Sequence, residues 1–151
     1  MVTLAIRKHE ELTSLTGYTD DLEAKIQTLN NGDCPVKGLF TLSYEQHVFS
    51  MADISENYKG GQWTLNQGIW LLNDDMSFVV GNPNAMRDEI LNTKSFSMFC
   101  SIAALNALAW SYHKKKFSNL ANLAIYAYHR AYTQLEYEND AQADVIRSLL
   151  D

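Results

Sequence analysis

The chain has 151 residues, of which 46% are hydrophobic and 20% are charged, a composition typical of one compact globular domain. Its formal net charge is −6, and its longest run of basic residues is 114–116. A dedicated nucleic-acid binder is not expected, because such proteins need a basic surface to displace counterions from phosphates. The 18 acidic residues occur in short scattered groups, which argues against imitation of DNA by charge.

The beginning of the chain and its cysteines indicate a cellular compartment. Residues 1–12 have too short an apolar run, and carry charge too early, for a secretory signal, so we expect a cytoplasmic protein. Cys34 and Cys100 lie far apart, without the CxxC or Cys/His spacing of a zinc site. We expect two reduced thiols, no metal and no cofactor.

The first third of the chain predicts two helices and a loop. Apolar spacing favours a helix over 4–15, and a pair of aspartates opens a second helix that runs to about residue 30. Residues 33–40 contain Pro35 and Gly38, which is typical of a loop or a short extended piece.

A third helix is predicted to begin at Ser43. Ser43 and Gln46 have the spacing of a capping box, in which each side chain bonds to the backbone N–H of the other residue. Apolar residues then recur at steps of three and four up to Tyr58, and the glycines of residues 59–61 end the helix. His47 lies near the apolar face, where a hydrogen-bonded histidine is commoner than a catalytic one.

The following segment predicts a small antiparallel meander. Three short runs rich in β-forming residues are separated by polar turn residues: 62–65, 69–72 and 76–80. Residues 81–84, Gly-Asn-Pro-Asn, read as a turn. Trp63 and Trp70 lie on the same or on opposite faces depending on the register, and an exposed tryptophan would be a candidate partner anchor.

Residues 92–113 are the predicted centre of the fold. The segment has no charge between Lys94 and Lys114, Asn92 can cap its start, and lysines follow its end, so both termini indicate a helix. Its polar residues scatter around the helical wheel and reserve no face for water. We therefore expect a buried helix. A membrane span of similar length is the less favoured alternative, because four serines, Asn106 and four alanines make the segment only moderately apolar.

Two more helices are predicted after this central one. Phe117 and Ser118 begin a long helix that continues to about residue 138, and a short helix follows over 140–150. The predicted fold is therefore one α+β domain, in which a three-stranded or slightly larger antiparallel meander packs against a mainly helical bundle. One fully buried central helix organises the whole.

Motifs of catalysis are absent from the sequence. There is no GxSxG, HExxH, P-loop or GxGxxG pattern, and the four histidines are far apart. Gly60 and Gly61 could approach an anion, although a helix end followed by a strand is the commoner reason for such a pair. Asn106 must find a hydrogen bond inside the apolar helix, and we expect a structural role for it.

The order of several weak motifs resembles the ArdB/KlcA-type antirestriction proteins over residues 43–151. The first group is a helix with an early glutamate, a Tyr-x-Gly-Gly-x-Trp segment and a hairpin turn: Glu45, Tyr58, Gly60, Gly61, Trp63, Asn66 and Gly68. The second group lies in the later helices: Ala104-Leu105-Asn106, Arg130, Tyr132, Ala143, Asp144, Ile146, Leu150 and Asp151. The hairpin after Trp63 is shorter than in the family, and residues 1–40 match nothing in it.

This resemblance implies an antirestriction protein of mobile DNA, from a plasmid, phage or genomic island, that relieves type I restriction-modification without being an enzyme. We expect it to act on the restriction complex or on an accessory host factor, with no direct nucleic-acid or membrane binding. The candidate partner-binding residues are Tyr58, Gly60, Gly61, Trp63, Arg130 and Asp144. The residues with expected structural roles are Asn66, Gly68, Asn92 and Asn106.

Two other classes of function stay open on the sequence. One is a small-ligand-binding or enzymatic domain with a pocket between the meander and the central helix, lined by Tyr58, Trp63 and Asn106. The other is a generic structural or immunity-type interaction module.

Overall fold

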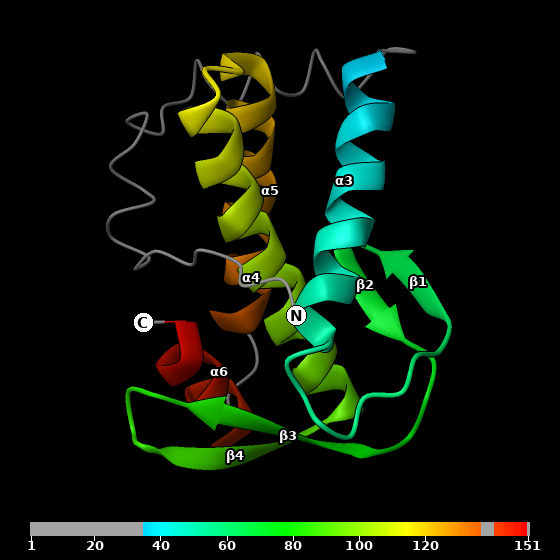
Figure 1. The fold of residues 1–151 in the computed structure, drawn as a ribbon, viewed down its shortest axis with the longest axis vertical. Coiled ribbons are helices and arrows are strands. Elements are labelled where there is room, and N and C mark those ends of the chain that lie inside the picture. The colour runs from blue at the N-terminus through cyan, green and yellow to red at the C-terminus, as the bar shows by residue number, and fades with distance from the viewer. Residues whose placement is uncertain (1–34, 137–140, 151) are drawn as a thin grey trace.

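The computed structural model describes residues 35–136 and 141–150, and Figure 1 shows how they are arranged. The helices in these ranges are α3 (Pro35–Ala52), α4 (Thr93–Lys114), α5 (Ser118–Glu136) and α6 (Ala141–Leu150). The strands are β1 (Trp63–Asn66), β2 (Ile69–Leu72), β3 (Ser77–Asn82) and β4 (Arg87–Asn92). The predicted α+β class is confirmed. The helices predicted over 4–15 and 19–30, and Cys34, lie outside the described residues.

Helix α4 is the central element, as predicted. Every residue from Ser95 to Ala109 is buried, and the other described helices and both hairpins pack around it (Figure 1). The Asn92 side chain accepts a hydrogen bond from the Ser95 backbone N–H at 2.8 Å, which confirms the predicted N-cap. At the other end, Lys116 has a positive φ of 63° and the Phe117 N–H bonds back to the Tyr112 carbonyl, closing the helix.

Three hydroxyl side chains at four-residue spacing line one side of α4. The Ser101 hydroxyl accepts from the Trp70 N–H at 3.0 Å and donates to the Trp70 carbonyl at 3.1 Å. The Ser97 hydroxyl accepts from the Leu72 N–H at 3.0 Å, and the Thr93 hydroxyl exchanges two hydrogen bonds with the Met76 backbone. We call Thr93, Ser97 and Ser101 the hydroxyl ladder. Residues 70–76 therefore run antiparallel to the helix and bond to its side chains.

The hydroxyl ladder explains why the predicted three-stranded meander does not form. Strands β1 and β2 make one antiparallel hairpin, with Asn66 opposite Ile69, and β3 and β4 make a second, with Val79 opposite Ile90. Because the free edge of β2 bonds to Ser97 and Ser101, it is not available to pair with β3. The sheet is two separate hairpins, and β4 was not predicted at all.

Carboxamide side chains cover both outer edges of the β3–β4 hairpin. Asn57 accepts from the Val79 N–H at 3.0 Å and donates to the Ser77 carbonyl, so it satisfies the edge of β3. Gln142 of α6 accepts from the Asn92 N–H at 2.9 Å and donates to the Ile90 carbonyl at 3.1 Å, so it satisfies the edge of β4. Each amide reproduces the donor and acceptor of a neighbouring strand.

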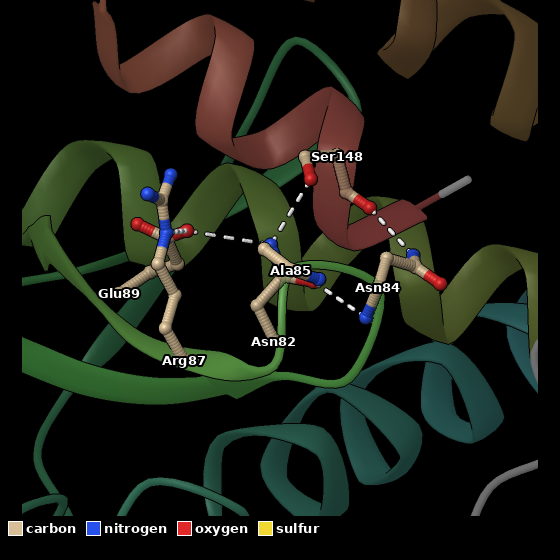
Figure 2. A network of polar contacts seen from close by, with 6 residues as sticks. All are labelled: Asn82, Asn84, Ala85, Arg87, Glu89 and Ser148. Atoms are coloured by element: carbon tan, nitrogen blue, oxygen red, sulfur yellow. Dashed lines mark hydrogen bonds and ion pairs between the residues drawn. The ribbon is translucent and has the colours of Figure 1, made fainter.

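Helix α6 is fastened to the turn of the same hairpin by a polar network (Figure 2). The buried Asn82 amide donates to the Ser148 hydroxyl at 3.0 Å, and Asn84 donates to the Ser148 carbonyl at 2.8 Å. The buried Glu89 carboxylate accepts from Arg87 at 2.8 Å. This network pairs the one acidic side chain on the inner face of β4 with a cation, as burial of a charge requires.

Helix α3 begins earlier and ends earlier than predicted. Residues 35–40, predicted as a loop, belong to it, because Pro35 fits the first helical position without loss of a hydrogen bond. Ser43 is therefore inside the helix, where its carbonyl lies 2.8 Å from His47 Nδ1, and the predicted capping box does not start the helix. Turns replace the predicted helical residues after Ala52.

Candidate functional site

Four of the six candidate partner-binding residues lie in one bend between α3 and β1: Tyr58, Gly60, Gly61 and Trp63. We call this bend the glycine corner. Gly60 and Gly61 are exposed, whereas the side chains of Tyr58 and Trp63 are half-buried against the core. The corner therefore combines an exposed backbone with an anchored aromatic pair.

Tyr58 fixes the glycine corner to the core. Its hydroxyl accepts from Trp63 Nε1 at 2.9 Å, and the two rings meet edge to face with centroids 6.0 Å apart. The Tyr58 ring also lies 6.4 Å from Phe78 and 6.2 Å from Phe96, which stack on each other. Burial raises the pKa of Tyr58 above its ordinary value, so the neutral hydroxyl is the form that holds Trp63.

The two glycines of the corner have different reasons to be glycine. Gly61 has φ +147°, and a Cβ added there would lie 2.7 Å from Cδ1 of the buried Leu72. Gly60 has φ +93°, and nothing lies within 4 Å of the position of its Cβ. Gly61 is therefore required for packing, while Gly60 leaves open surface at the bend.

Arg130 and Asp144, the other two candidates, lie on other elements. Arg130 is exposed on α5, with its guanidinium 5.7 Å from the centre of the Tyr126 ring. Asp144 on α6 pairs with Arg147 at 3.0 Å, and Arg147 also donates to the Leu135 carbonyl at the end of α5. Figure 1 shows α6, the helix that contains Asp144, and β1 on opposite sides of α4.

The residues expected to have structural roles occupy structural positions. Asn66 is the last residue of β1, and Gly68 follows it with φ +82° in a two-residue turn with Gln67, whose φ is +52°. Two successive positive φ values are what a type I′ hairpin turn requires. Asn92 caps α4, and Asn106 is completely buried within it.

A pocket lies between the β1–β2 turn and the first half of α4, with a volume of about 340 Å³. Its lining contains both polar and apolar side chains: Asn66, Gln67, Ile69, Leu71, Lys94, Met98 and Gln134. The sequence suggested a pocket between the meander and the central helix, but with other lining residues. None of the three residues expected to line it, Tyr58, Trp63 and Asn106, belongs to this lining.

Among residues 35–136 and 141–150, no three His, Cys, Asp or Glu side chains come together as they would around a metal ion. Cys100 is completely buried as a free thiol, and burial raises its pKa. None of the helices in the described part of the chain combines the length and apolarity needed to cross a membrane.

Sequence reasoning missed the polar groups that hold the hairpins in place. The hydroxyl ladder has a recognisable signal, since Thr93, Ser97 and Ser101 are spaced by four and so share one side of a helix. The carboxamide caps, Asn57 and Gln142, have no comparable signal. Each acts on a strand edge far away in the sequence, and one amide in a turn or a helix looks like any other.

No family model matches the chain, and no curated protein sequence matches it significantly.

Proposed function

We propose that this protein is an antirestriction protein that relieves type I restriction-modification of incoming mobile DNA through protein–protein contact. The proposal starts from the ordered resemblance of residues 43–151 to ArdB/KlcA-type proteins. The observation that supports it best is the glycine corner. Its tyrosine and tryptophan are held by a hydrogen bond and by ring contacts, while the adjacent glycine backbone is exposed.

Such a corner suits a contact with another protein. Aromatic side chains that are already fixed lose little conformational entropy on binding, and an exposed backbone can approach a partner closely. The partner in this proposal is the type I restriction complex or an accessory host factor. The moderate charge of −6 fits a mechanism other than imitation of the DNA helix. The proposed mechanism is non-enzymatic and involves no cofactor.

Phage plating tests the proposal directly. Unmodified phage is plated on a host with a type I system, with and without this protein, and on a matched host without restriction. We expect the protein to raise plating only on the restricting host. Equal plating with and without the protein would refute the proposal for that restriction system.

Substitutions in the glycine corner locate the contact. Gly60→Asn adds a side chain to open surface, and asparagine is one of the L residues that best tolerate a positive φ, so it should block a partner at a cost of about 1 kcal/mol in stability. Met86→Ala is the matched control, because Met86 is 92% exposed in the β3–β4 turn on another part of the molecule. We expect Gly60→Asn, but not Met86→Ala, to reduce the plating gained. Unchanged plating for both variants would move the contact away from the corner.

The pocket beside α4 supports a second candidate function, the binding of a small ligand. Its volume of about 340 Å³ is at the small end of ligand sites, and its lining combines polar amides with apolar side chains. Leu71→Trp would fill it, since Leu71 lines the pocket and is only half-buried. If ligand binding is the function, this variant should lose activity while Gly60→Asn keeps it. The opposite result favours the partner-binding proposal.

A further inference from the structure

Three of the four outer strand edges in the described part of the chain are bonded to side chains. The edge of β2 bonds to Ser97 and Ser101, the edge of β3 to Asn57, and the edge of β4 to Gln142. In each case a hydroxyl or an amide meets the backbone groups that a neighbouring strand would otherwise meet. Such side-chain caps prevent a strand edge from pairing with another chain.

The outer edge of β1 lacks such a cap. The Asn73 N–H donates to the Gln62 carbonyl, so the residues of β1 that bond to β2 are the alternate ones that include Thr64. The backbone N–H and C=O groups of Trp63 and Leu65 therefore face away from β2. Within the described ranges, β1 pairs with no strand other than β2, and no side chain bonds to these outward groups.

Strand β1 is exposed, and the segments next to the first hairpin in the sequence carry mostly acids, while Lys94 of α4 lines the pocket beside Asn66. Thr64, Leu65 and Asn66 are exposed, with Leu65 at 42%. Between residues 53 and 75 the charged side chains are four acids and one base, and all five are exposed: Asp53, Glu56, Lys59, Asp74 and Asp75.

Two contacts place these acids near the strand. Asp53 follows the end of α3, where the Phe49 ring lies 6.1 Å from the Trp63 ring. Asp74 follows Asn73, whose amide donates to the Thr64 hydroxyl at 3.0 Å. An extended chain lying along β1 would therefore meet negative charge beside its path.

We propose that the β1 edge binds an extended segment of another protein as an added strand, with basic residues flanking the part that pairs. Strand addition supplies affinity through backbone hydrogen bonds, here to Trp63 and Leu65, while neighbouring side chains supply selectivity. The inference deepens the proposed function, on which it rests only for the biological identity of the partner.

A second copy of this chain is a poor occupant for the edge. Two copies would pair strands of only four residues each, whereas stable interfaces bury about 1,200–2,000 Å² in total. Both copies would also bring a net charge of −6 and the same acidic residues to the contact. A basic extended segment avoids the repulsion between like charges, and it needs to order only a short stretch of chain along β1.

The test uses the isotope-labelled full chain and a synthetic heptapeptide, acetyl-Lys-Thr-Val-Thr-Val-Thr-Lys-amide, followed by NMR. We expect saturable shifts centred on the Trp63 and Leu65 amides, and about tenfold slower hydrogen exchange of these two amides at saturation. The same peptide with glutamate in place of both lysines should bind at least about tenfold more weakly, because like charges repel. Shifts centred elsewhere, or equal binding of both peptides, would overturn the proposal.

Two variants test the edge itself. Leu65→Pro removes an outward N–H that β2 does not use, and proline is tolerated at strand edges, so it should abolish binding. The matched control, Leu65→Val, keeps the N–H and should bind as the parent does. If Leu65→Pro does not fold, Leu65→Lys keeps the N–H but adds a positive charge, and it should weaken the basic peptide about tenfold. Unchanged binding by the folded edge variant would overturn the proposal.

The peptide-binding experiment and phage plating test different claims, so a negative result in one does not imply a negative result in the other. Peptide binding without any effect on plating would leave the β1 edge as a strand-binding site and refute the antirestriction function. Plating that survives an edge variant, in a protein that has lost peptide binding, would separate the edge from antirestriction. Shifts at Trp63 and Leu65 that depend on protein concentration alone would identify a second copy as the occupant and overturn the inference.

Discussion

The two hairpins of this protein differ in how many of their outer strand edges are bonded to side chains: both edges in one hairpin and one edge in the other. The β3–β4 hairpin is closed on both sides, by Asn57 and by Gln142, and its turn is fastened to α6 through Ser148. The β1–β2 hairpin is closed on one side by the hydroxyl ladder, and its other side faces outward beside the glycine corner. The comparison shows that an open edge is a local property of one strand, because the same chain caps its other edges with single side chains.

The largest expected effect on stability comes from removing one hydroxyl of the hydroxyl ladder. Ser101→Ala leaves both the N–H and the carbonyl of the buried Trp70 without their present partner, which should cost about 2–4 kcal/mol of unfolding free energy. Chemical denaturation measures the loss. Ser111→Ala in the same helix is the control, because Ser111 is only half-buried and should change stability by less than about 0.5 kcal/mol. Equal effects of the two substitutions would show that the ladder does not hold β2.

Two glycines that flank β1, Gly61 before it and Gly68 after it, give the next effect. Gly61→Ala combines a positive φ with a Cβ 2.7 Å from Leu72, and we expect a loss of about 2–3 kcal/mol. Gly68→Ala also has a positive φ but meets nothing within 4 Å, so its loss should be about 1 kcal/mol. Thermal or chemical unfolding of both variants measures the difference. A larger loss at Gly68 would show that the approach of Gly61 to Leu72 is not the constraint.

Removing a carboxamide cap should make the second hairpin resemble the first. Asn57→Ala and Gln142→Ala should each cost about 0.5–1.5 kcal/mol, since each removes two hydrogen bonds to strand groups that water can then reach. Hydrogen exchange should accelerate at Val79 in the first variant and at Asn92 in the second. If exchange rises equally at both amides in both variants, the two edges open together and are not capped separately.

The smallest expected effect is on the outer face of the second hairpin. Ile90 is 63% exposed, so Ile90→Thr should change the unfolding free energy by less than about 0.5 kcal/mol. Val80 lies on the inner face at 1% exposure, and Val80→Thr should cost about 1–2 kcal/mol by burying a hydroxyl. Denaturation curves for the pair measure the contrast. A comparable loss at Ile90 would mean that this face is covered by other parts of the chain.

Most of the fold could be predicted from local patterns. The central helix was placed to within one residue at each end, because its cap, its uncharged length and its terminal lysines all agree. The strands of the first hairpin were also predicted to within one residue, since their β-forming residues flank a polar turn. These signals lie within a few residues of the element that they define.

The failures have a common physical cause in long-range contacts. Strand β4 was missed because its alternation is inverted: the acidic Glu89 faces inward and the apolar Ile90 faces outward. That arrangement is stable because Arg87 and Asn82 bond to Glu89. The alternation of apolar and polar residues along the sequence does not reveal such a network. The single meander was predicted because nothing local shows that the edge of β2 bonds to a helix.

Within the candidate site, sequence reasoning located the glycine corner but not its neighbourhood. Tyr58, Gly61 and Trp63 were selected by resemblance, and the structure gives each a contact that explains its residue type. The open β1 edge depends on which residues of the hairpin face outward, and that depends on the register and on the ladder. Register is weakly encoded in a strand such as β1, in which neither face is fully buried.

Because the three hydroxyls of the hydroxyl ladder repeat every four residues, α4 also fixes the positions at which residues 70–76 bond along it. One residue inserted between Thr93 and Ser101 would rotate the Ser101 hydroxyl by about 100° around the helix axis relative to Thr93. The hydroxyl would then point away from the Trp70 backbone that it now contacts. One residue inserted into the loop 73–75 would only lengthen the chain between Leu72, which bonds to Ser97, and Met76, which bonds to Thr93. We therefore expect natural length variation to accumulate in that loop and to spare the first half of α4.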